Sequence, residues 1–243
     1  MDQPGLCAVR RFVVEALAPE SGQVRLDPAT SHHLLVVCRH PRGAQLIVFD
    51  RGGLEADAEL IDVEEGCAVL RLCSAPRSAA VRTPRHLVLG LPRGPALDHA
   101  LRMAVELGIT HLHPVLAARS VRRSDRADRW QRILEGAARQ CGRADVPELR
   151  PLSPLDQVLP LLPDALACFV GVPGGPRLRP GPGPAALAIG PEGGFTPAEI
   201  QRALAVGWQP AGLGAWVLRT DTAVAAGLAL LAPDPGPGAP GPS

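Results

Sequence analysis

The stretch Gly190–Phe195 (GPEGGF) is the segment of the sequence best suited to hold a ligand. It follows an apolar run and precedes a helix-start signal. Its three glycines and one proline favour a tight loop whose bare backbone a ligand can approach closely, and open α/β folds bind ligands at the carboxyl ends of their strands. An ordinary strand-to-helix turn explains the glycines equally well. The stretch matches neither G-x-G-x-x-G nor G-x-x-x-x-G-K-S/T, so nucleotide sites of those two kinds are not supported.

A second segment, Leu213–Ala223 (LGAWVLRTDTA), combines a glycine turn with Arg219 just before an Ala/Leu-rich helix. Thr220 or Asp221 would be an ordinary N-cap of that helix. Capping does not account for Arg219, because an arginine between an apolar residue and a buried helix usually has an anionic or polar partner.

The third segment is a basic run over residues 119–143, with eight arginines against three acidic residues. Arg126, Arg129 and Arg132 recur every three residues and therefore fall along one side of a helix. A solvated helix face is the common explanation of such a run. Its excess of positive charge makes a ridge that binds nucleic-acid phosphates an equally good interpretation.

Histidines and cysteines give weaker signals. His32-His33 and His111-x-His113 lack further ligands at suitable spacing, so we expect no metal site. None of the six cysteines forms a CxxC pair, which indicates reduced thiols in a cytoplasmic protein. The first twenty residues lack the features of a signal peptide, and no apolar stretch is long enough to span a membrane.

Composition sets limits on the class of protein. The chain has 243 residues, of which 46% are apolar, enough to bury a sizeable core. Its 25 basic residues are all arginine and are balanced by 24 acidic residues. This balance excludes a uniformly basic coat protein for nucleic acid but allows a local basic face.

The expected elements fall into two parts. Alternating apolar runs predict strands over 45–50, 54–63 and 67–73, so residues 1–75 are expected to form a small β-barrel or sandwich, and the polar stretch 76–84 a linker. The rest alternates strands and helices, which predicts an α/β domain over 85–232 with a mainly parallel sheet covered on both faces. Its strands are expected at 85–91, 110–116, 165–170 and 185–189, and its helices at 95–107, 125–141 and 222–231, with another opened by a Thr196/Glu199 capping box. Residues 173–184 are expected to form a mobile surface loop, and 233–243 a disordered tail.

Five ordered blocks of the sequence resemble the RsmE family of 16S ribosomal RNA uridine-N3 methyltransferases, in the knotted SPOUT superfamily. They span nearly the whole chain up to about residue 231. The blocks are Arg10–Val14 with His33–Arg39, Gly43 and Val48–Asp50; Ala104–Ile109 with Pro114 and Ala118–Val121; Arg129-Trp130 with Ala137–Arg143 and Pro147; GPEGGF with Glu199; and LGAWVLRTDTA. One such block would be weak support, whereas five in order at plausible spacing are strong support.

The resemblance implies a PUA-like RNA-binding barrel at 1–75 and a SPOUT-type methyltransferase domain with a deep trefoil knot at 85–232. It implies S-adenosylmethionine as cofactor, a homodimer, no metal, and 16S ribosomal RNA or the small ribosomal subunit as partner. Three loops would wrap the cofactor. The residues that it implies for cofactor binding are Gly171, Val172, Ile189, Gly190, Pro191, Glu192, Gly193, Gly194, Leu213, Gly214, Leu218 and Arg219.

Methylation of uridine N3 requires loss of the N3 proton, so the attacking species is an anion. Arg219 is the candidate for stabilising that anion, and Glu192 and Asp221 are candidates for the base or for holding Arg219. The residues expected to bind RNA are Arg10, Arg11, Arg39, Arg119, Arg122, Arg126, Arg129 and Arg143. The sequence departs from the family pattern at Arg93, Arg139 and Asp221, where the family has Lys, Glu and Glu.

Other functions remain open at this point. The chain could be an RNA-binding relative that has lost activity, with Arg139 and Asp221 as symptoms. It could be a methyltransferase that acts on another ribosomal or transfer RNA site. A phosphate-binding metabolic enzyme with GPEGGF as an anion loop fits least well, because it leaves the basic run and the first seventy-five residues unexplained.

Overall fold

The computed structural model describes residues 11–17, 22–50, 52–78, 83–120, 126–162 and 166–231. Their contacts divide the chain into two compact units: a first unit from residues 1–80 and 138–146, and a second unit from residues 81–137 and 147–243. Arg10, Arg122 and the tail 233–243, each the subject of a prediction, lie outside the described residues.

The first unit contains a mainly antiparallel sheet with strand order β1-β3-β4-β5-β2, in which β6 also pairs with β4 and β1 runs parallel to β3. The three predicted strands are confirmed as β3, β4 and β5. The short helix α1 (Pro28–His32) runs directly into a π-helical turn at His33–Val37. The strands are β1 Arg11–Val13, β2 Gln23–Arg25, β3 Gln45–Phe49, β4 Leu54–Glu64, β5 Cys67–Leu72 and β6 Arg77–Ser78.

Strand β6 lies within the stretch that was expected to be a linker. It pairs with the start of β4, and the Arg77 side chain forms ion pairs with Glu55 and Asp57 at 2.9 Å. Glu55 also pairs with Arg11, and both of those side chains are largely buried. These partners lie twenty or more positions away in sequence, so the polar composition of the stretch hides the strand.

The second unit is built on a parallel sheet with strand order β10-β8-β7-β12-β11-β13, with β9 beside β8. Every pairing in it is parallel, which confirms the predicted α/β sheet. The expected strands are present, and three short ones that were not predicted extend the sheet: β9, β10 and β13. The strands are β7 Arg85–Gly90, β8 His111–Leu116, β9 Glu148–Leu149, β10 Ser153–Pro154, β11 Ala167–Gly171, β12 Ala185–Ile189 and β13 Gln209–Ala211.

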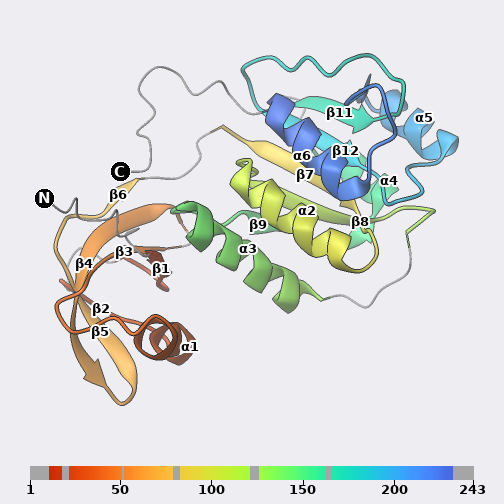
Figure 1. The fold of residues 1–243 in the computed structure, drawn as a ribbon. Coiled ribbons are helices and arrows are strands. Elements are labelled where there is room, and N and C mark those ends of the chain that lie inside the picture. The colour runs from red at the N-terminus through yellow and green to blue at the C-terminus, as the bar shows by residue number, and fades with distance from the viewer. Residues whose placement is uncertain are drawn as a thin grey trace, which may run out of the picture. The chain divides into compact units, whose positions relative to one another are not determined.

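Helices cover both faces of this sheet. In Figure 1, α2 (Pro95–Glu106) and α6 (Thr220–Leu231) lie side by side on one face, which agrees with the contacts between the two helices and between α6 and β12. On the other face α4 (Leu155–Val158) and α5 (Pro197–Ala205) pack together over an apolar core. The predicted Thr196/Glu199 capping box opens α5.

Helix α6 lies very close to the sheet because Gly227 faces Leu187. A Cβ atom added at Gly227 would lie 2.4 Å from Leu187 Cδ2, so any larger residue would force the Leu187 side chain to shift within the core. At the end of the helix, the buried Arg85 donates from Nε to the carbonyl of Leu231 at 3.0 Å. A guanidinium at this end also complements the helix dipole. Together these contacts fix α6 against β7 and β12.

Helix α3 (Ala127–Cys141) carries the basic run. Trp130, Leu134, Ala137 and Ala138 are buried on its predicted apolar face, and Ile133 is half-buried. Within the part of the chain that the structure describes, no helix combines the length and the apolar character that crossing a membrane would need.

Three histidines gather at the amino ends of β7 and β8. His86 Nδ1 lies 3.0 Å from His113 Nε2, and the His86 and His111 rings stack with centroids 4.1 Å apart. Burial, with a further contribution from the neighbouring imidazoles, lowers the pKa of His86 to about 3 and that of His113 to about 4. Among the described residues, no group of three or more His, Cys, Asp or Glu side chains could hold a metal ion.

These depressed pKa values predict that the fold loses stability on acidification at a pH higher than that at which carboxylates take up protons. As pH falls through about 6.5, the two histidines take up protons in the unfolded chain but stay neutral in the folded one. The free energy of unfolding should therefore fall by roughly 1–3 kcal/mol between pH 7 and pH 5. Urea unfolding at each pH measures this change. The double replacement His86→Leu and His113→Thr should make the free energy of unfolding depend less on pH. His32→Gln, at an exposed position, should leave that dependence unchanged. An equal dependence on pH in the wild type and both variants would contradict the prediction.

Candidate active site

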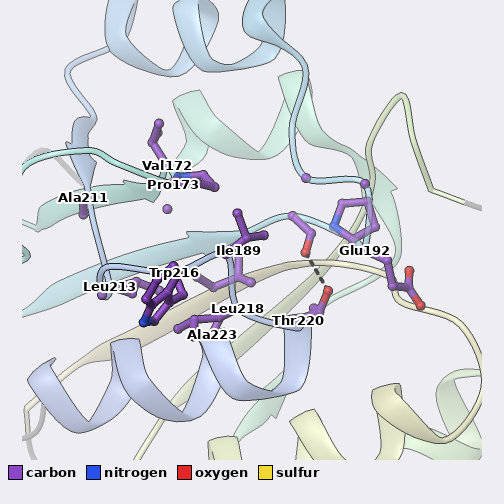
Figure 2. A pocket seen from close by; sticks show the side chains of 17 residues that line it. Val172, Pro173, Ile189, Glu192, Ala211, Leu213, Trp216, Leu218, Thr220 and Ala223 are labelled. Atoms are coloured by element: carbon purple, nitrogen blue, oxygen red, sulfur yellow. Dashed lines mark hydrogen bonds between the residues drawn. The ribbon is translucent and has the colours of Figure 1, made fainter.

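Three loops of the second unit meet at one edge of the parallel sheet. They follow β11, β12 and β13, which are neighbours in the sheet and run in the same direction, so their carboxyl ends lie together. The loops enclose a cavity, which Figure 2 shows from close by. Its lining is Gly171, Val172, Pro173, Ile189, Gly190, Pro191, Glu192, Gly193, Gly194, Ala211, Leu213, Gly214, Trp216, Val217, Leu218, Thr220 and Ala223.

Glycines let these loops close on themselves and on one another. A Cβ atom at Gly190 would lie 2.8 Å from the main chain of Gly194 and Phe195, and one at Gly212 would lie 2.2 Å from the Gly175 carbonyl. Gly194 also has a positive φ of 67°. The backbone therefore needs glycine at these positions for steric reasons, whatever the loops bind.

The loop 173–184 is partly fixed, although the sequence predicts a mobile surface loop. Leu178 is buried and donates its N–H to the Gly212 carbonyl at 3.0 Å, and Gly212 donates to the Pro176 carbonyl at 2.6 Å. The first half of the loop is thus tied to the segment after β13. The low-complexity composition hides this anchor, because it consists of two backbone hydrogen bonds and one buried side chain, that of Leu178.

The side chains that line the cavity are mostly apolar, and most of its polar surface comes from the main chain of the loops. Ile189, Leu213, Leu218 and Ala223 contribute apolar surface, while the glycine loops expose main-chain N–H and C=O groups. Glu192 is the one charged residue among those that line it, and Figure 2 shows it at the end of the cavity away from Leu213. This combination suits a flat heteroaromatic group with polar edges and a positive charge nearby.

Glu199 and Arg119 connect the GPEGGF loop to the loop that follows β8. Buried Glu199 accepts hydrogen bonds from the N–H groups of Ala118 and Thr196, both at 2.7 Å. Burial alone would raise the pKa of Glu199, but these bonds and that from the Thr196 hydroxyl outweigh it and lower the pKa. Arg119 donates to the Gly193 carbonyl. The loop after β8 is thereby joined to the loop after β12.

Of the proposed catalytic side chains, Glu192 lines this cavity, and Arg219 and Asp221 line a cavity next to it. Glu192 Oε1 accepts from the Arg93 backbone N–H at 2.6 Å. Asp221 is nearly buried, and its Oδ1 lies 3.7 Å from Nε of the exposed Arg219. Thr220 donates its hydroxyl to the Gly190 carbonyl at 3.3 Å, the dashed line in Figure 2, and so links the start of α6 to the GPEGGF loop.

Comparison with known proteins identifies the family. Residues 80–232 match the family model of the RNA methyltransferase domain. A ribosomal RNA small subunit methyltransferase E of Synechocystis sp. is 34% identical over 227 residues, which cover 88% of this chain and 75% of the relative. The chain belongs to the ribosomal RNA small subunit methyltransferase E family. The family member of Bacillus subtilis is 30% identical and matches 79% of this chain and 82% of its own length.

Solved structures of similar proteins agree. A ribosomal RNA small subunit methyltransferase E of Neisseria gonorrhoeae, bound to S-adenosyl methionine, superimposes with a TM-score of 0.84 at 29% identity and covers 91% of this chain and 95% of its own. A Legionella pneumophila methyltransferase in complex with the same cofactor gives a TM-score of 0.80 at 28% identity and covers 92% and 96%. The resemblance stated from sequence is thus confirmed at the level of the family and of an α/β fold shared with its members.

In this member of the methyltransferase E family, the structure brings together eleven of the twelve residues predicted to bind the cofactor. These eleven residues line the cavity shown in Figure 2, and the twelfth, Arg219, lines the cavity next to it. Sequence reasoning missed Trp216, Val217 and Thr220, although they lie inside the segment it singled out. Ala223 also lies in that segment, whereas Ala211 carries no chemical signal and only the fold places it here.

The arginines predicted to bind RNA fall into two groups. Arg39, Arg119, Arg126 and Arg129 are exposed, although Arg119 is bonded to Gly193, as above, and Arg129 pairs with Asp98 of α2 at 2.6 Å. Two others are engaged in largely buried ion pairs: Arg11 with Glu55, and Arg143 with Asp145. A guanidinium committed to a buried carboxylate is not available to a phosphate, so we leave Arg11 and Arg143 out of the RNA-binding surface.

The glycine geometry gives a direct test of the loop. Gly190→Ala should lower the free energy of unfolding by about 1–3 kcal/mol, because its Cβ meets backbone that cannot yield. Gly214→Ala is the matched control: Gly214 lines the same cavity but has no atom within 4 Å of an added Cβ, so its effect should stay within about 0.5 kcal/mol. Urea unfolding compares the two, and equal losses would contradict this account of the loop.

Proposed function

We propose that this protein uses S-adenosylmethionine to methylate N3 of a uridine in the 16S ribosomal RNA of the small ribosomal subunit. The observation that carries the proposal is the cavity in which three glycine-rich loops converge, lined by eleven residues that the family resemblance assigns to the cofactor. Membership of the methyltransferase E family supports the substrate class.

The residues present fit this cofactor. The apolar side chains of Ile189, Leu213 and Leu218 suit the faces of an adenine, and the main chain of the glycine loops suits its polar edges and the amino acid moiety. When bound, the cofactor supplies a methyl group on a positively charged sulfur. Glu192 provides negative charge at one end of the cavity, as such a ligand requires.

The charged side chains beside the cavity favour the anionic form of the substrate base. Removal of the N3 proton leaves negative charge on the uracil, and the Arg219 guanidinium is free to turn toward it because 81% of its side chain is exposed. The Asp221 carboxylate lies beside the Arg219 guanidinium, with Asp221 Oδ1 3.7 Å from Arg219 Nε. Glu192 accepts a hydrogen bond from the backbone N–H of Arg93. Arg93 lines the same cavity as Arg219, so it offers a second guanidinium there.

We further propose the finer features that the family resemblance implies. The first unit acts as a PUA-like RNA-binding barrel, the second unit contains a trefoil knot, and two copies form a homodimer in the cytoplasm. The domain limits are proposed as 1–75 and 85–232. Exposed Arg39, Arg126 and Arg129 contribute to RNA binding through phosphate contacts.

A direct assay tests the reaction. The purified protein, given S-adenosylmethionine and unmodified small ribosomal subunits, should produce N3-methyluridine in digested RNA, detected by mass spectrometry. Heat-inactivated protein is the control. Methylation of another base or of ribose would contradict the assigned target atom, and binding of the cofactor with no methyl transfer would favour an inactive RNA-binding relative.

Replacement of Arg219 tests its role as the stabilising charge. Arg219→Ala should slow methyl transfer by about 10²- to 10³-fold, because the anion loses its nearest guanidinium. The thermal unfolding temperature should stay unchanged, since the side chain is exposed. Arg202→Ala, an exposed arginine of α5, is the matched control and should keep full activity. Full activity of Arg219→Ala in a single-turnover assay would eliminate this assignment.

A further inference from the structure

A second cavity, of about 400 Å³, adjoins the cofactor cavity. The two share Glu192, Val217, Leu218 and Thr220 as a common wall. The second cavity lies within the roughly 300–1,000 Å³ range of small-molecule sites, so it can admit a nucleotide beside the methyl donor. Its other walls come from residues around the starts of α2 and α6, namely Arg93, Pro95, Ala96, His99, Arg219 and Asp221.

The two carboxylates of this cavity are poorly suited to accept a proton. Glu192 already accepts a hydrogen bond from the Arg93 backbone, and Asp221 Oδ1 accepts one from the Thr222 N–H at 3.0 Å. Protonation would weaken both bonds. An imidazole is the side chain that most often serves as a general base.

His99 is the imidazole of this cavity. It lies on α2, its side chain is 59% exposed, and its Nδ1 is 3.9 Å from Oδ2 of Asp221, whose own side chain is only 13% exposed. A carboxylate beside Nδ1 favours the tautomer with the proton on that nitrogen, which leaves the lone pair of Nε2 for a second partner. The other charged groups of the cavity are Arg93, Arg219 and Glu192, and α2 also carries Asp98 and Arg102 next to His99 and one turn on.

We propose that this second cavity takes the target uridine and that His99 is the catalytic base of the reaction, with Asp221 as its positioning residue. The inference rests on the proposed function. The N3–H bond of uracil breaks and its proton passes to Nε2 of His99. The electron pair left on N3 forms the bond to the methyl carbon, while the carbon–sulfur bond breaks and its electron pair stays on sulfur. The imidazolium next to Asp221 then releases its proton to water.

Single-turnover rates of the full-length protein on unmodified small subunits test the base. His99→Gln should slow transfer by about 10²-fold and remove the rise of rate with pH over the range in which histidine titrates. Asp221→Asn should slow transfer in the wild type far more than in the His99→Gln background, because Asp221 acts on this step through the imidazole. Arg102→Gln, an exposed residue one turn further along α2, is the control and should match the wild type. Calorimetry should find the same S-adenosylmethionine affinity in His99→Gln and wild type.

Two further readouts separate a base from a structural residue. Added imidazole should restore activity to His99→Ala several-fold, since the exposed position leaves room for it. Carbethoxylation of His99 by diethyl pyrocarbonate, followed by peptide mass spectrometry, should slow several-fold when S-adenosylhomocysteine and unmodified subunits are bound. Failure of both effects would overturn the inference.

The outcomes distinguish this inference from the proposed function. If the wild type forms N3-methyluridine and His99→Gln keeps its rate and pH profile, the base is another group while the function stands. If the wild type forms no N3-methyluridine, both are overturned. Formation by the wild type, a slow His99→Gln with a flat pH profile, and rescue by imidazole would support both.

Discussion

The parallel pairing of β12 with β11, and of β11 with β13, is the constraint on which the site depends. Parallel neighbours point their carboxyl ends the same way, so three loops separated by up to forty residues in sequence reach one edge of the sheet. Each crossover must then be a long connection, and α5 supplies one of them between β12 and β13. Without this parallel pairing the three glycine-rich loops would not meet around one cavity.

Close approach of backbone is the second requirement, and small residues provide it. Gly227 lets α6 lie against Leu187, and α6 in turn delivers Thr220 and Asp221 to the cavity edge. Gly190 lets the GPEGGF loop close on itself, and Gly212 lets the loop after β13 contact the loop after β11. The buried Glu199, bonded to two backbone N–H groups, then fixes the loop after β8 to the same assembly. The cavity is therefore preformed by packing and backbone hydrogen bonds.

The sequence predicts what is local and misses what is distant. The Thr196/Glu199 capping box, the strands of the parallel sheet and the GPEGGF loop all follow from neighbouring residues, and the structure bears them out. The partner of Arg11 is Glu55, and that of His99 is Asp221, far along the chain, so no spacing rule reveals them. The short strands β9, β10 and β13 have two or three residues, too few for a period-two pattern to show.

The most direct test of the central claim is a crystal structure of the protein with S-adenosylhomocysteine bound. The account predicts the adenine against Ile189, Leu213 and Leu218, polar atoms on the main chain of the loops after β11, β12 and β13, and the sulfur facing the cavity that holds His99 and Arg219. A ligand bound elsewhere, or a sulfur turned away from that second cavity, would contradict it.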